Sequence, residues 1–131
     1  MEEILKSIPG AIELFTWFGY WPGFHDAEIV SLRLNRSGAS TLQIHTWHTT
    51  DQVDVQGYYI MEKHLLVCFQ MEEIISLSLS DFNSQNVISG LGISQSEDGF
   101  IIDIDPCYGL SGRIAARKIS IEIEPLPAGL C

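Results

Sequence analysis

The apolar residues near the amino terminus recur with the period of an α-helix. This period predicts a short helical turn over residues 2–7 and a helix over about residues 10–18. Pro9 is suited to the start of the second helix, and Gly19 to a left-handed cap at its end. The apolar positions of this helix are Ile12, Leu14, Phe15 and Phe18.

From about residue 27 the period changes to two, which is typical of strands with one face in a core and one face in water. In 28–36, for example, Val30, Leu32 and Leu34 share one face. Similar alternation predicts further strands at 41–49, 63–71, 75–80, from 91, at 100–105 and at 119–124, where Pro125 and Pro127 end the last one. Residues 51–61 are polar at first and predict a short strand or a loop.

The turns between these segments are those of hairpins. Asn35-Arg36-Ser37-Gly38 and Glu97-Asp98-Gly99 both carry residues that tolerate positive φ. No helical pattern separates the later strands, so parallel crossover connections are disfavoured. We therefore expect one α+β domain over residues 1–131. Its largely antiparallel sheet has six to eight strands, sandwich-like or rolled, with one N-terminal helix packed on it.

Charge is the global property that bears on partners. Seven basic and seventeen acidic residues give a formal net charge of −10. Such a charge repels nucleic acid and anionic membrane, and it attracts a basic protein. The acidic N-terminus and the lack of a long apolar run predict a cytoplasmic location. The acids on polar faces or in loops that a basic partner would meet are Asp51, Asp54, Asp103 and Asp105.

The three cysteines do not suggest a disulfide framework, because their number is odd and they are widely spaced. Cys68 lies in an apolar run and is expected in the core, whereas Cys131 is expected to be a tail thiol. Cys107 is in a loop-like segment and is the one conceivable nucleophile. Neither a base nor an oxyanion motif accompanies it, so we expect no catalytic residue.

His25, Asp26 and Glu28 are residue types that bind metals, and His45 and His48 follow. On a strand, however, residues three apart point to opposite faces, which argues against a shared ion. We therefore expect no metal and no cofactor. A small metal-dependent or ligand-binding domain that uses His25, Asp26 and Glu28, with His45 and Cys107 in the same pocket, is the alternative.

The segment that contains His25, Asp26 and Glu28 resembles the signature of the immunity protein 50 family. Its matching residues are Trp21, Pro22, Phe24, His25, Asp26, Ala27 and Glu28. Weaker similarity follows in order along the chain, in residues 45–46, 50–51, 57–59, 81–83, 85–87 and 106–112. The resemblance implies a bacterial immunity protein that binds and neutralises a toxin encoded beside it.

The resemblance supplies no catalytic residue. We interpret the signature as structural, with Phe24 buried, His25 and Asp26 fixing the turn before the first strand by hydrogen bonds, and Glu28 either facing outward or paired locally. An acidic surface that covers the active site of a basic, nuclease-like toxin is our leading hypothesis. A module that works by self-association is a third possibility, and the sequence leaves the oligomeric state open.

Overall fold

The computed structural model describes residues 2–126, so Pro127 and Cys131 lie outside the described part of the chain. Within these residues, two short helices, α1 (Glu2–Lys6) and α2 (Ala11–Phe18), precede six strands. The strands are β1 (Glu28–Arg33), β2 (Ser40–Val53), β3 (Tyr59–Ser80), β4 (Val87–Ser96), β5 (Gly99–Tyr108) and β6 (Ser111–Pro125). Every neighbouring pair is antiparallel, which confirms the expected α+β class.

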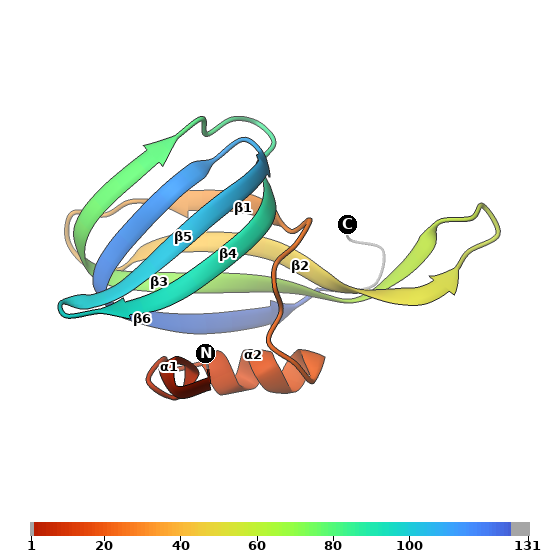
Figure 1. Ribbon diagram of the computed structural model, residues 1–131, viewed down its shortest axis with the longest axis horizontal. Helices are drawn as coiled ribbons and strands as arrows, with labels where there is room; N and C mark the ends of the chain where they lie inside the picture. Colours follow the sequence, from red (N-terminus) through yellow and green to blue (C-terminus); the bar gives the residue numbers. More distant parts are fainter. Residues whose placement is uncertain (1, 127–131) are drawn as a thin grey trace.

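The sheet is rolled until its two edges meet, in the order β1-β2-β3-β6-β5-β4 (Figure 1). Only Glu28 and Val87 are paired across the β1–β4 seam. In β2, β5, β6 and the part of β3 from Leu65 to Met71, the inward positions follow the predicted alternation and fill the barrel with side chains, as a small barrel requires. Fully buried members of this core include Leu42, Ile44, Leu65, Val67, Phe69, Met71, Ile102 and Ile114.

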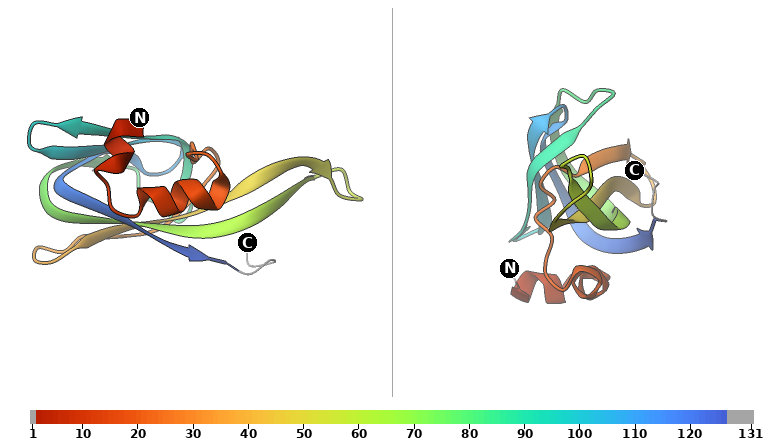
Figure 2. Two further views of the ribbon diagram at one scale, coloured as in Figure 1. Left: turned by 90° about the horizontal axis from the view of Figure 1, so that it is seen from below. Right: turned by 90° about the vertical axis from the view of Figure 1, so that its right-hand side faces the viewer.

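Helix α2 lies outside the barrel against β6 (Figure 2). Ala11, Leu14 and Phe18 are buried, whereas Ile12 and Phe15 face outward although they belong to the predicted apolar set. Gly19 ends the helix with φ 83°, and its N–H donates to the Phe15 carbonyl at 2.7 Å, as predicted. None of the helices within residues 2–126 is long and apolar enough to cross a membrane.

The predicted core face of the first strand is wrong at two positions. Val30 and Leu34 are exposed, and the strand ends at Arg33 rather than at residue 36. A bulge between Ile29 and Ser31 leaves Val30 as an extra residue outside the ladder. A bulge shifts the inward alternation by one residue, so a strict period of two fails there.

The predicted break between the strands at 63–71 and 75–80 does not exist, because β3 is continuous over both. A register shift between Ile74 and Ser76 leaves Ile75 exposed, and Leu77 is exposed as well. Cys68 is half-buried on the outer face rather than in the core. Its neighbours Val67 and Phe69 point inward, and successive side chains of a strand alternate.

The β2–β3 hairpin continues beyond the barrel as a two-stranded ribbon, seen at one end of Figures 1 and 2. Strand β6 pairs with β3 only from Leu65 onward, so β2 is the one strand paired with the preceding residues of β3. Val53 lies opposite Tyr59 near the tip of the ribbon. We call residues 48–63 the arm. The short strand or loop predicted for 51–61 is part of it.

Candidate functional site

The signature segment forms the connection from α2 to β1. Phe24 and Asp26 both have positive φ, 62° and 66°, a backbone conformation that is unusual for non-glycine residues. Phe24 is buried, and its ring lies 5.9 Å from Phe69 and 6.2 Å from Trp21, measured between ring centroids. The aromatic ring therefore fixes this connection in one end of the core while the chain turns sharply around it.

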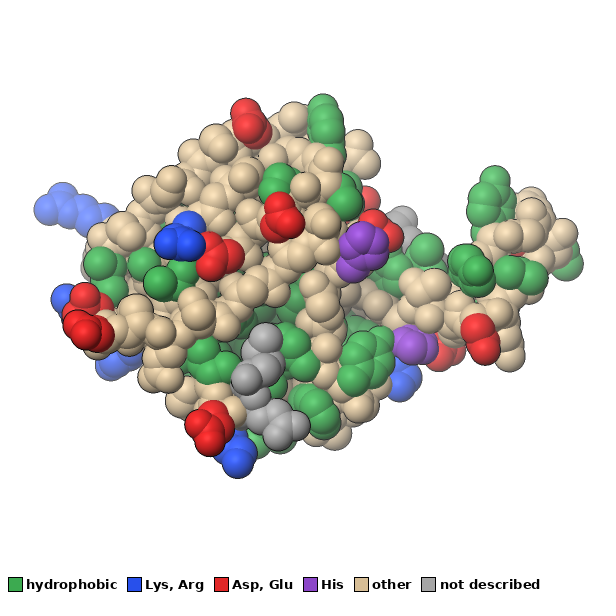
Figure 3. Space-filling model, in the orientation of Figure 1, with side chains coloured by type: hydrophobic (Ala, Val, Ile, Leu, Met, Phe, Trp, Pro, Cys, Tyr) green, Lys and Arg blue, Asp and Glu red, His purple; other side chains and the backbone are tan. Residues whose placement is uncertain are grey.

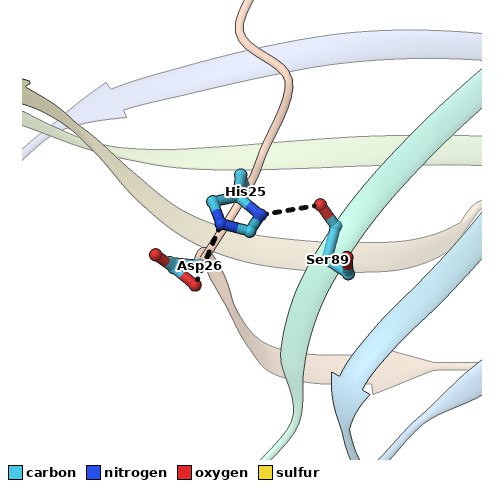
Figure 4. Close-up of polar contacts among 3 residues, drawn as sticks. All are labelled: His25, Asp26 and Ser89. Atoms are coloured by element: carbon cyan, nitrogen blue, oxygen red, sulfur yellow. Dashed lines mark hydrogen bonds and ion pairs between the residues drawn. The ribbon is translucent and has the colours of Figure 1, made fainter.

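The polar residues of the segment join this turn to β4 (Figure 4). His25 Nδ1 lies 3.0 Å from the Ser89 carbonyl oxygen, and His25 Nε2 lies 3.6 Å from Asp26 Oδ1. The Asp26 N–H donates to the Ile88 carbonyl at 2.8 Å. These contacts lie at the β1–β4 seam, where the strand ladder itself has a single pair. They hold the two edges of the barrel together.

Asn86 connects the same seam to the turn between β5 and β6. Its buried side chain accepts a hydrogen bond from the Leu110 N–H at 2.9 Å and another from the Asn83 N–H at 3.1 Å. Its amide group donates to the Asn83 carbonyl at 2.8 Å, and its own carbonyl accepts from the Ile29 N–H. The segment at 106–112 thus contacts the segment at 85–87, and Val87 of the latter lies opposite Glu28 of the signature.

The metal-dependent or ligand-binding alternative required His25, Asp26 and Glu28 to share a pocket. His25 and Asp26 are largely exposed and contact β4, whereas Glu28 lies opposite His45 of β2. Within residues 2–126, no three histidine, cysteine or acidic side chains are grouped closely enough to hold a metal ion. Cys107 is exposed on β5. The arrangement gives these residues no common reaction centre.

A polar cluster that the sequence did not indicate lies near the base of the arm. His45 Nε2 is 3.1 Å from His64 Nδ1, and the Trp47 ring lies 5.0 Å from the His45 ring, centroid to centroid. Burial lowers the pKa of His45, His64 lowers it further, and Glu28 opposes the shift. The neutral form of His45 is therefore favoured, and one imidazole donates to the other.

The four acids predicted to meet a partner do not form one patch. Asp103 and Asp105 lie on β5 in the barrel wall, and Asp103 accepts a hydrogen bond from Arg113 Nε at 2.7 Å. Asp51 and Asp54 lie on the arm. In Figure 3 the acidic side chains are dispersed over the visible face. The predicted acidic surface is therefore a distributed negative charge with one part on the arm.

The arm also carries exposed apolar side chains, which green spheres mark in Figure 3. Six occur between residues 53 and 61: Val53, Val55, Tyr58, Tyr59, Ile60 and Met61. The sequence patterns did not predict that these six residues form an exposed apolar surface. The turn signal Asp54-Val55-Gln56-Gly57 between apolar residues was available to predict a hairpin there. The projection of this hairpin beyond the barrel could not be predicted, because hydrophobic periodicity does not indicate where the pairing of a sheet ends.

Comparison with known proteins adds one match. No curated protein and no solved structure matches the chain. The model of a protein family described as Immunity protein 50 matches residues 10–125, which include α2 and all six strands. The matched range contains the signature turn, the seam that it closes and the whole arm. With this match over most of its length, the chain belongs to the Immunity protein 50 family.

Proposed function

We propose that this protein protects the cell that makes it by binding a toxin protein and blocking its active site. The observation that carries the proposal is the family match over residues 10–125. The barrel interior supports a binding role, because it is filled with apolar side chains such as Leu42, Ile44 and Phe69 rather than hollow. In this proposal the outer surface acts on the toxin and no bond is made or broken.

The net charge of −10 indicates which toxins fit. A basic toxin that acts on nucleic acid has a cationic site, and an acidic protein competes for that site electrostatically. Long-range attraction accelerates the encounter, while close contacts determine how long the complex lasts. In this proposal Asp51, Asp54, Asp103 and Asp105 contribute to the attraction from two separate parts of the surface.

Co-expression with the toxin domain encoded next to the gene of this chain tests the proposal. We expect bacterial growth to be restored and the two proteins to copurify as a stoichiometric complex. Toxin recovered from the complex by denaturation and refolding should regain its activity at unchanged mass, because binding leaves it chemically intact. Continued growth arrest beside abundant folded protein would contradict the proposal, and so would a permanent change in the mass of the toxin.

A further inference from the structure

We infer that the arm is the element that enters the active-site cleft of a basic toxin, with its apolar tip as the central contact. This inference rests on the proposed function and adds the surface and the mode of contact. The arm is narrow, it projects beyond the barrel (Figure 1), and all residues from 51 to 63 are exposed. A projecting hairpin of this kind fits a concave site on its partner, as long binding loops do.

The apolar side chains of the arm have no role in the core of this protein. Val55 at the tip is fully exposed, and Tyr58 and Tyr59 are more than 60% exposed. Val53, Ile60 and Met61 extend the apolar surface down both strands. Single exposed apolar residues are ordinary, but six exposed apolar side chains within nine residues of a projecting element mark an interaction site. Tyrosines supply large contact area at low cost in side-chain entropy.

The tip is organised before any partner arrives. The Asp54 N–H donates to the Tyr58 carbonyl, and Asp54 Oδ1 accepts hydrogen bonds from the Gln56 and Tyr58 N–H groups at 2.9 and 3.1 Å. Gly57 has φ 89°, as the last residue of a three-residue hairpin loop with a bulge should. Less conformational entropy is lost on binding when the loop already has its final shape.

The base of the arm is braced against α2 and the residues that follow it. The Tyr20 hydroxyl lies 2.7 Å from His48 Nδ1, and the Trp17 indole N–H donates to the Lys63 carbonyl at 3.3 Å. Lys63 has φ 55°, which bends β3 where it leaves the barrel. The arm is thus held at its base from the side on which α2 lies, and its direction is part of the fold.

The charges of the arm indicate which kind of partner it fits. Asp51, Asp54 and Glu62 are exposed beside the apolar residues, and Lys63 is the one basic residue between positions 48 and 63. A second copy of this protein would bring the same carboxylates and a charge of −10 against them, and like charges across an interface are unfavourable. A cleft with an apolar floor and a cationic rim complements both features of the arm.

The inference is tested by calorimetry, which measures how tightly the wild-type protein and three variants bind the toxin domain encoded by the neighbouring gene. The arm variant combines Val55→Ser, Tyr59→Thr and Met61→Thr. The matched control makes the same kind of change at three exposed apolar positions of the barrel, with Val30→Thr, Leu34→Thr and Ile75→Thr. We expect the arm variant to bind at least about 100-fold more weakly and the control to stay within about threefold of wild type.

The third variant, Val55→Ser alone, covers the case in which the triple change disturbs the ribbon. Val55 has no buried contact to lose, and we expect about tenfold weaker binding. Thermal melts of each variant establish that the barrel is folded. Wild-type affinity in folded arm variants overturns the arm as the contact and leaves the proposed function intact. Failure of the wild-type protein to bind the toxin overturns both.

Sedimentation at increasing concentration provides a further test of the partner. We expect the free protein to sediment with the same mass at all concentrations and the complex to contain one copy of each chain. A homodimer that dissociates in the arm variant, while toxin binding persists, would assign the arm to self-association and overturn the inference.

Discussion

At the scale of single residues, Asn86 is a buried side chain with several hydrogen-bond partners, and it lies in a loop between strands. Asn86 is buried and uses its carbonyl oxygen and amide together to hold backbone groups at Asn83 and Leu110. A buried polar side chain is tolerated only when its hydrogen bonds are made. Asn86 therefore helps to determine how the β3–β4 loop meets the β5–β6 turn.

Residue identity alone predicted part of this end of the barrel. The sequence placed His25 and Asp26 in the turn before the first strand, and the structure has a turn at these two residues. The contact of His25 with Ser89 joins residues that are 64 positions apart. No local pattern encodes a pairing of that kind, because it depends on the closure of the whole barrel.

The His45–His64 pair predicts how stability responds to acid. Because the pKa of His45 is lowered in the folded protein, the unfolded chain binds more protons from just above pH 6.5 down to the folded pKa. Stability is therefore fully present above pH 6.5 and falls as the pH drops through this window. Urea denaturation at pH 7.5, 6.5 and 5.5 should show this loss in the wild-type protein.

Two variants separate His45 from other groups that titrate. His45→Gln should flatten the pH dependence of the free energy of unfolding. The reason is that glutamine cannot bind the proton that His45 takes up in the unfolded chain. Glu28→Gln should steepen it, because the Glu28 carboxylate raises the pKa of His45 and thereby opposes the shift. Equal pH slopes for wild type and His45→Gln would contradict the assignment of this effect to His45.

At the scale of elements, hydrophobic alternation located strands correctly where the ladder is regular. Within 41–49 and 63–71, the alternate side chains that were predicted to face the core do so. The predicted Asp98-Gly99 hairpin joins β4 to β5. The errors at Val30 and Ile75 occur at bulges, where one extra residue shifts the alternation. Bulges at Val30 and Ile75 follow from neighbouring strands that the local sequence does not specify.

The attachment of α2 to the barrel depends on Gly10. This residue has φ 90°, and a methyl group there would overlap the carbonyl oxygen of Ile121 in β6. Gly10→Ala should reduce the free energy of unfolding by about 3 kcal/mol, through a strained φ together with displacement of the helix. Gly19 also has positive φ, 83°, but nothing lies within 4 Å of the same position.

Gly19→Ala is therefore the matched control, and it should cost about 1 kcal/mol from the backbone conformation alone. Urea denaturation of both variants measures the difference. Equal destabilisation by the two changes would mean that the close approach of Gly10 to β6 adds nothing to the attachment of the helix.

At the scale of the whole molecule, the barrel and the arm have different physical requirements. The barrel is stable because its apolar side chains leave water, whereas the arm keeps apolar side chains in water and relies on its turn, its ladder and its braced base. Sequence patterns treat both kinds of apolar residue alike. The candidate contact surface was therefore invisible until the end of the pairing between β3 and β6 was known.

The same division predicts how salt affects binding. The net charge acts over the Debye length, which shrinks from about 30 Å at 0.01 M salt to about 3 Å at 1 M. The association rate with a basic toxin should therefore fall at least about tenfold across this range. The dissociation rate should change by no more than about threefold, because the apolar contacts of the arm are short-ranged.

Charge reversal distinguishes steering from contact in the same rapid-mixing experiment. Asp51→Lys with Asp105→Lys changes the formal charge from −10 to −6 and alters one acid on the arm and one on the barrel wall. Association should slow at low salt and approach the wild-type rate at 1 M, where both proteins are screened. If the slower rate persisted at high salt, the two carboxylates would be direct contacts. If neither salt nor reversal changed the rate, long-range attraction would play no part in the encounter with the proposed toxin.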